Sequence, residues 1–268
     1  MAYIFVVGRT LPEVWEKSVV ECWEKGDGFR TEYDKPTDPP SKDCTALLVV
    51  KEPFSEPRIH RAFPGGLDDL EIYRQEVVDG VHDHWVCPEE GKWSYTYHQR
   101  MRAYEIDGET VDQIQYVIDK LSETPHSRRA QAITWNPAVD PTVDDPACLQ
   151  RMWFRLNDAN QLILQVSIRS NDAFKAAFMN MFAFTELQRE VAAAITQRTG
   201  TEITVGDYVH FANSYHIYGS YFEQFEGFLR TLKERTFEQR VWDSTSDLVQ
   251  EQFEYGRKRL AEERTREL

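Results

Sequence analysis

The sequence has few cysteines, no long apolar run and fewer basic than acidic residues, and each shortage excludes a class of protein. Its four cysteines are widely scattered with no CxxC pair, so neither a disulfide framework nor a thiolate zinc site is indicated, and we expect no metal site. No run approaches the roughly 18 apolar residues that a membrane span needs, and the N-terminus lacks the features of a signal peptide. These shortages predict a cytoplasmic protein without a membrane partner.

The scarcity of positive charge bears on possible ligands. The chain has 31 Lys and Arg residues against 45 Asp and Glu residues, a formal net charge of −14. This balance disfavours a general nucleic-acid surface, because phosphate backbones bind to a basic footprint. A single phosphate group does not need a wide basic surface, since a local cluster of arginines can bind it. We therefore expect a small phosphorylated ligand and no nucleic-acid partner.

What the sequence does contain is sufficient for one sizeable core. The chain has 268 residues, 41% of them hydrophobic and 13% aromatic, so residues 1–268 are predicted to form a single α/β or α+β domain. Apolar spacing and turn residues predict helices over 10–26, 67–79, 111–123, 172–198 and 219–236, strands over 45–51, 129–135 and 207–213, a hairpin over 151–169, and a charged C-terminal helix over 246–268.

Four segments carry the most specific patterns of the sequence. They are Asp112-Gln113 with PHSRR (residues 125–129) and WNP (residues 135–137), RSND (residues 169–172) with Asn180, GDYVH (residues 206–210) with HIY (residues 216–218), and YHQRMRAY (residues 97–104). Together they resemble the conserved segments of thymidylate synthases and the related pyrimidine nucleotide hydroxymethylases. The resemblance implies a thymidylate synthase-like α/β (α+β) fold, a mixed β-sheet packed with helices, and a sheet-mediated homodimer with shared active sites.

Cys148 is the predicted nucleophile. Carbon 5 of a pyrimidine is a poor nucleophile until C6 is attacked by a group that can later leave, and a thiolate meets that requirement. A lone cysteine is more often an inert buried residue, but here Cys148 precedes the strand that leads to Arg169. A nearby arginine would also lower the thiol pKa. The resemblance adds Tyr97 to the catalytic residues.

The other site residues follow from the same resemblance. It implies that four arginines and one serine bind the 5′-phosphate: Arg30, Arg128, Arg129, Arg169 and Ser170. Of these, Arg128 and Arg129 would be supplied by the opposite subunit. It implies that Asn180 recognises the pyrimidine edge, and that His216 and Tyr218 bind the sugar. The expected folate-binding residues are Asp172, His82, Trp85, Ala176 and Met179. Asparagine offers both a donor and an acceptor, so Asn180 cannot by itself choose between cytosine and uracil.

The family also requires a glutamate that organises water and moves protons near the base. The segment LEIYRQE over residues 70–76 offers two, and we expect Glu71 to take this role, with Glu76 as the alternative. An exposed position on the helix is the competing interpretation for either carboxylate.

The departures from the family pattern bear on the product. The usual PPCH around the nucleophile is PACL here, HDHW (residues 82–85) resembles a WDEW segment, and the sequence printed ends in EERTREL rather than an apolar tail. His82 in place of a screening tryptophan predicts a wetter site, in which water rather than hydride quenches the methylene intermediate. We therefore expect a CMP 5-hydroxymethylase that uses 5,10-methylenetetrahydrofolate, similar to those of antibiotic biosynthesis. The alternatives are a thymidylate synthase acting on dUMP, a dCMP hydroxymethylase, and a catalytically silent nucleotide-binding homologue.

Overall fold

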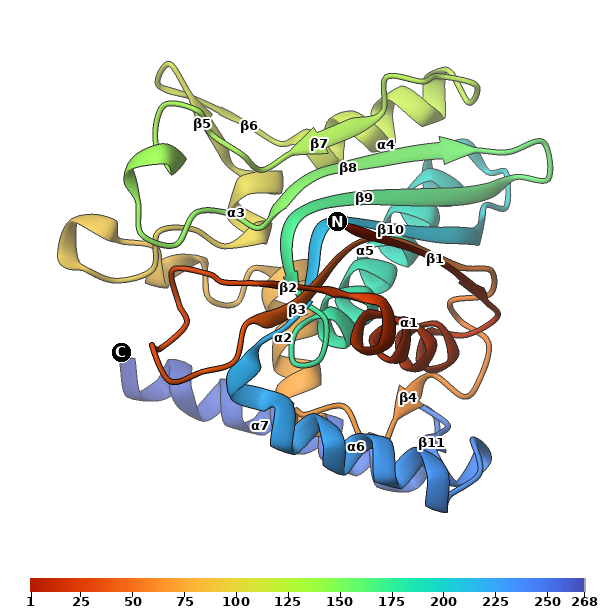
Figure 1. The fold of residues 1–268 in the computed structure, drawn as a ribbon. Helices are drawn as coiled ribbons and strands as arrows, with labels where there is room; N and C mark the ends of the chain where they lie inside the picture. The colour runs from red at the N-terminus through yellow and green to blue at the C-terminus, as the bar shows by residue number, and fades with distance from the viewer. Residues whose placement is uncertain (268) are drawn as a thin grey trace.

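The computed structural model describes residues 1–267, and its framework is a mixed β-sheet (Figure 1). Within that range the main sheet has seven strands, with the order β1-β3-β10-β9-β8-β7 and β2 paired to β3. The bounds are β1 (Ala2–Gly8), β2 (Asp27–Phe29), β3 (Ser41–Val50), β7 (Gln131–Ile133), β8 (Leu149–Leu156), β9 (Gln161–Asp172) and β10 (Thr204–Ile217). The pairs β1–β3 and β9–β10 are parallel and the other neighbours are antiparallel. The predicted mixed sheet packed with helices is confirmed.

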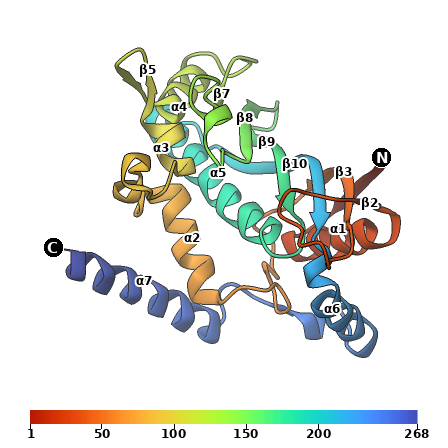
Figure 2. The ribbon, with the colours of Figure 1, turned by 60° about the vertical axis from the view of Figure 1, so that its left-hand side comes forward.

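Helices cover one face of this sheet (Figures 1 and 2). They are α1 (Leu11–Lys25), α2 (Leu67–Asp79), α3 (Tyr97–Arg102), α4 (Gln113–Glu123), α5 (Ala177–Thr199), α6 (Phe222–Glu234) and α7 (Asp247–Glu267). Two small antiparallel pairs complete the fold, β4 (Ile59–His60) with β11 (Val241–Trp242) and β5 (Tyr104–Ile106) with β6 (Glu109–Val111). Helix α5 lies against β9 and β10 and is buried on most sides, which explains its apolar sequence. Even so, no helix within residues 1–267 is long and apolar enough to cross a membrane.

The opposite face of the sheet remains open. Burial alternates along the strands, as expected where only one face is packed. The strand registers place the exposed residues side by side, for example Phe5 opposite Leu47 and Ile133 opposite Arg151. Several of these side chains are large and apolar: Tyr3 is 76% exposed, Phe5 63%, Val7 42%, Ile133 41% and Leu47 37%. The open face is therefore an apolar surface that spans several strands.

Trp15 ties the core to the segment between β9 and α5. Its indole N–H donates to the carbonyl oxygen of Ala173 at 2.9 Å, and its ring stacks on Phe174 with 6.4 Å between centroids. The side chain is fully buried, so its truncation to alanine would cost roughly 3–5 kcal/mol. Because Ala173 directly follows Asp172, this packing holds a predicted site residue in place.

Two segments differ from the predictions. Residues 97–102, for which no helix was predicted, form helix α3, because Thr96 caps the helix by accepting the Gln99 N–H at 2.9 Å. Strand β1 was not predicted, since its alternating pattern is short and lies at the chain terminus. The predicted C-terminal helix forms as α7 and packs on α2 through Val249, Phe253 and Leu260, whereas Leu248 and Tyr255 are exposed.

Candidate active site

A cavity of about 430 Å³ opens between α2 and the segment that leads into α3. Its lining is polar and aromatic: Tyr73, Glu76, Lys92, Trp93, Ser94, Tyr95, Thr96, Tyr97 and Asp145. The volume is within the range of small-molecule sites, and several hydroxyl and carboxyl groups converge on it. Residues 1–267 contain no group of three or more His, Cys, Asp or Glu side chains placed to hold a metal ion.

Cys148 and Arg169 lie together beside this cavity. The Arg169 guanidinium donates from Nε to the carbonyl of Ala147 at 3.1 Å and from Nη2 to the carbonyl of Pro146 at 2.6 Å, and its main-chain N–H donates to the Cys148 carbonyl at 2.8 Å. The arginine thus holds the loop that carries the thiol. Because the guanidinium has five N–H donors, donors remain for a phosphate.

The thiol of Cys148 is half-buried, and burial raises its pKa above the ordinary value. Arg169 lowers this pKa, as predicted, while Asp145 raises it. The expectation of a net lowering is therefore wrong for the protein alone, because desolvation of the thiolate outweighs the attraction of one guanidinium.

Tyr97 fixes the main chain next to the nucleophile. Its hydroxyl oxygen accepts the Leu149 N–H at 3.2 Å, and its ring lies 5.6 Å from the ring of Tyr95. The hydroxyl of Tyr95 in turn interacts with Tyr97 and with the main chain of Cys148. Burial raises the pKa of both tyrosines, so both hydroxyls stay protonated at neutral pH. The structure thus brings Tyr97 to Cys148, and adds Tyr95, to which sequence reasoning assigned no role.

Asn180 is buried on α5 and turned toward α2. Its Oδ1 accepts a hydrogen bond from the hydroxyl of Tyr73 at 2.5 Å. Tyr73 lines the cavity, and its pKa is raised by burial and by neighbours that include Glu76 and Cys148. The structure therefore places Asn180 and Cys148 around one site. Tyr73 was missed because one tyrosine in an amphipathic helix carries no distinguishing signal.

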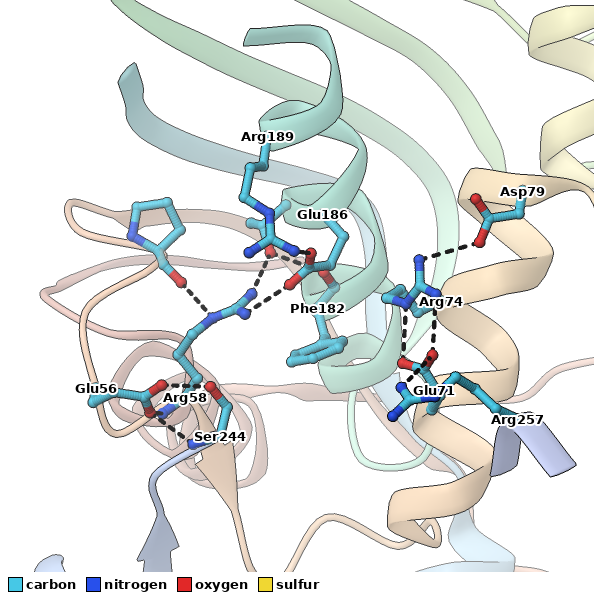
Figure 3. Close-up of polar contacts among 12 residues, drawn as sticks. Glu56, Arg58, Glu71, Arg74, Asp79, Phe182, Glu186, Arg189, Ser244 and Arg257 are labelled. Atoms are coloured by element: carbon cyan, nitrogen blue, oxygen red, sulfur yellow. Dashed lines mark hydrogen bonds and ion pairs between the residues drawn. The ribbon is translucent and has the colours of Figure 1, made fainter. Parts of the chain in front are cut away.

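The two candidate glutamates of α2 lie on different sides of the helix. Glu71 is buried in an ion-pair cluster with Arg74, at 3.0 Å, and with Arg257 of α7, at 3.2 Å (Figure 3). Glu76 instead lines the cavity. Five residues of an α-helix turn through about 140° beyond one full turn, so both cannot face one site. Glu71 therefore does not line the cavity beside Cys148, whereas the alternative candidate, Glu76, does.

His82 is buried between α2 and the turn at Asp83–Trp85. Its Nδ1 lies 2.9 Å from Oε2 of Glu76, and its ring stacks on Trp85 at 3.9 Å. The site does not lack a flanking indole, because Trp93 lines the cavity and contacts both rings edge-on. The expectation that His82 leaves the site unscreened is therefore corrected: His82 is a buried partner of a cavity carboxylate.

Asp172 provides an acceptor at the entry to α5. Its Oδ1 accepts the main-chain N–H groups of Phe174 and Lys175 at 3.0 and 2.8 Å, which leaves Oδ2 for a donor from a ligand. Burial raises the pKa of Asp172 to about 6, although the two N–H groups oppose this. A pterin carries N–H donors that would fit such an acceptor. Ala176 and Met179 follow at the start of α5 and are partly exposed.

His216 presents one unpaired nitrogen. Ser214 has a single hydroxyl proton, which it donates to Asp43 at 2.6 Å, so its oxygen accepts from His216 Nδ1 at 3.1 Å. This chain assigns the proton to Nδ1 and leaves Nε2 as an acceptor. Nε2 is buried with no hydrogen-bond partner in the part of the chain that the structure describes, and burial lowers the pKa of His216 to about 4. A hydroxyl of a sugar is a suitable donor, and Tyr218 lies beside the ring at 4.6 Å.

Two of the remaining phosphate candidates, Arg128 and Arg129, lie away from the cavity beside Cys148. Arg128 and Arg129 line a separate hollow of about 540 Å³ beside α4 and β7, and they share it with no residue of the cavity. Arg30 is exposed after β2, and Ser170 is partly exposed next to Arg169 on β9.

The sequence and the fold of this chain are similar to those of known proteins of one family. A family described as "Thymidylate synthase" matches residues 65–255. A "Putative thymidylate synthase" of Methanocaldococcus jannaschii is 33% identical over 214 residues, which cover 78% of this chain and 88% of the relative. A protein of the same name from Methanosarcina acetivorans is 30% identical over 202 residues, covering 75% and 82% of the two chains. The fold is that of thermostable thymidylate synthase A from Bacillus subtilis, with a TM-score of 0.61, 20% identity and coverage of 82% and 84%. The chain therefore belongs to the thymidylate synthase family.

Proposed function

We propose that the protein transfers a one-carbon unit from 5,10-methylenetetrahydrofolate to C5 of a pyrimidine nucleotide monophosphate, with hydroxymethyl-CMP as the product. The observation that carries the reaction class is the placement of Cys148 between Arg169, Asn180 and Tyr97 at one cavity. Each group matches one part of a nucleotide. A guanidinium suits the phosphate, an amide suits the base edge, and a thiol suits addition to C6.

Each site residue has a separate role in the proposed reaction. The Cys148 sulfur forms a bond to C6 of the pyrimidine and later leaves it, which makes C5 nucleophilic in between. The folate supplies the electrophilic carbon when bound, and Asp172 with Met179 and Ala176 would hold it. His216 accepts a hydrogen bond from a sugar hydroxyl, with Tyr218 beside it, and Arg169 with Ser170 binds the phosphate.

The Glu76–His82 pair favours water as the final reactant. A carboxylate held at 2.9 Å by an imidazole lines the cavity, where it can orient a water molecule and accept its proton. Once the C5 proton is lost and the bond from the one-carbon unit to tetrahydrofolate breaks, that water would add to the methylene carbon on C5. The Cys148 thiolate would then leave C6, and the product would carry a hydroxymethyl group. The ring of His82 is itself buried, so the preference for water rests on the carboxylate of Glu76. The preference for CMP rests on the resemblance alone.

Methylation of dUMP is the second candidate. The relatives from methanogens are named putative thymidylate synthases, and Trp93 supplies an indole at the cavity that could exclude water. The two candidates differ in the folate product, because hydride transfer consumes tetrahydrofolate and hydration does not.

The proposed assembly is a homodimer joined through the open face of the sheet. An exposed apolar face with Tyr3 and Phe5 is typical of a protein interface. Ser167 pairs with Arg151 on the open face, and Arg169 lies two residues further along β9, so it points to the same side of the sheet. Arg128 and Arg129 line a hollow that is separate from the cavity of their own chain. A partner's arginine pair would therefore complete the phosphate site.

The test is incubation of the protein with CMP, dCMP, UMP or dUMP and methylenetetrahydrofolate, with products identified by mass. Hydroxymethyl-CMP without dihydrofolate supports the proposal. Dihydrofolate formed in step with a methylated product would show that the protein is a thymidylate synthase by activity and not a hydroxymethylase. If no nucleotide gave a product, the proposed reaction class would be rejected.

A further inference from the structure

Helix α7 contacts His82, the partner of the cavity residue Glu76, through a glutamate. Glu263 places its Oε2 3.5 Å from Nε2 of His82, on the side of the ring opposite Glu76. Nε2 is buried and makes no hydrogen bond within residues 1–267, so it lacks a partner unless Glu263 serves as one. A shift of a few tenths of an ångström would turn this ion pair into a hydrogen bond.

We propose that Glu263 is a positioning residue of the active site, which holds His82 so that the carboxylate of Glu76 faces the cavity. The proposal rests on the proposed function, in which Glu76 handles the water proton. An imidazolium has two N–H donors and needs two acceptors when buried. Glu76 and Glu263 supply one each. Without the second acceptor, His82 can turn or lose its proton, and Glu76 loses its fixed partner.

The pKa of His82 depends on burial and on the carboxylates of Glu76 and Glu263. Glu76 from α2 and Glu263 from α7 are the charged groups that raise its pKa, against the effect of burial. The other neighbours, Trp85 and Trp93, present aromatic rings at 3.9 and 5.7 Å. The ring planes limit rotation of the imidazole, so the line from Glu76 to Glu263 is maintained.

Helix α7 is anchored so that Glu263 reaches this position. Arg257 pairs with Glu71 at 3.2 Å (Figure 3), and Arg259 pairs with Asp68 and with Asp69, at 2.9 Å to the latter. Gly256 permits the close approach of the two helices, since a Cβ there would lie 2.6 Å from the main-chain oxygen of Asp68. The buried Glu71, which does not line the cavity, thus helps to hold α7 where Glu263 contacts His82.

The experiment compares Glu263→Gln with Glu262→Gln in the full chain. Glu262 is the adjacent residue, is 70% exposed and pairs only with Arg266 among the described contacts, so it is a matched control. The ring signals of His82 are followed by NMR in protein with ¹³C-labelled histidine and assigned by their loss in His82→Gln. We expect Glu263→Gln to lower the titration midpoint of His82 by about half a pH unit, and Glu262→Gln to leave it unchanged.

Turnover provides the second measurement. Glu263→Gln should lower kcat about fivefold and shift its pH profile, with the KM for the nucleotide unchanged. Gly256→Ala, which disturbs the seat of α7, should shift the His82 midpoint in the same direction. An unchanged midpoint and an unchanged pH profile in Glu263→Gln would overturn the proposal. The NMR titration needs no substrate, so it decides the role of Glu263 even if the proposed reaction fails.

Discussion

The hydroxyl of Tyr73 donates a hydrogen bond to Oδ1 of Asn180 across 2.5 Å, and this contact joins α2 to α5 at the cavity. It commits one lone pair of the amide oxygen and orients the amide nitrogen. The positions of the amide oxygen and the amide nitrogen of Asn180 are therefore fixed relative to the cavity, and in the proposed function this decides which edge of a base can pair with them.

Loss of this contact should weaken base selection. In Tyr73→Phe the amide can turn, so the ratio of kcat/KM for the preferred over the disfavoured base should fall about fivefold to tenfold, the value of roughly one hydrogen bond. The ratio is measured with CMP and UMP at equal concentration. Tyr255→Phe, at an exposed position of α7, is the control, and an unaltered ratio in Tyr73→Phe would show that Asn180 is oriented by other groups.

The two glutamates of α2 should respond in opposite ways. Glu76→Gln should reduce kcat by about 10²–10⁴-fold, the usual value of a general base, with little change in thermal stability. Glu71→Gln should retain most of the activity but lower the melting temperature, because Arg74 and Arg257 lose a buried partner. Turnover and thermal unfolding are measured on both variants. The reverse pattern would restore Glu71 as the functional carboxylate.

Removal of the thiol should separate chemistry from binding. Cys148→Ala should abolish turnover and keep nucleotide affinity within about tenfold, since the thiol is needed for covalent activation and Arg169 for binding. Affinity is measured by calorimetry. Cys87→Ala is the matched control, because Cys87 is also half-buried and not disulfide-bonded. A comparable loss of turnover in that variant would contradict the assignment of Cys148.

A mixture of two inactive chains tests the shared site. If Arg129 serves the partner's phosphate, Cys148→Ala mixed with Arg129→Ala should recover about a quarter of the wild-type activity, since half of the dimers are hybrids with one intact site each. Native mass spectrometry confirms subunit exchange. Exchange without recovery would mean that phosphate is bound within one chain.

The ionised carboxylate of Asp172 should lower the free energy of unfolding at neutral pH. Its pKa is about 6 in the folded protein against an ordinary value of 3.8, so the folded state keeps the proton more strongly and stability falls as the pH rises between these values. Asp172→Asn keeps an acceptor for the two N–H groups and removes the charge. At pH 7.5 it should be more stable by on the order of 1–2 kcal/mol, with a smaller gain at pH 4.5. Urea unfolding at both pH values measures this, with Asp158→Asn in an exposed turn as control; equal gains at both values would contradict the raised pKa.

The sequence by itself determined the class of fold and the identity of much of the site. Helices over 67–79 and 111–123 and the hairpin over 151–169 follow from apolar spacing, and the family segments single out Cys148, Arg169 and Asn180. These are local patterns, in which the residues that carry the signal lie within one or two elements.

Tertiary structure decided what local patterns cannot contain. Glu71 and Glu76 share a helix, and only the packing of α7 against α2 shows which of them faces the cavity. The pKa of Cys148 depends on how far burial outweighs Arg169, and burial is a property of the whole fold. Tyr73 contacts Asn180, which lies 107 residues away along the chain, and Glu263 of α7 contacts His82, which follows α2. Such contacts arise from the packing of distant elements, which no periodicity within either element specifies.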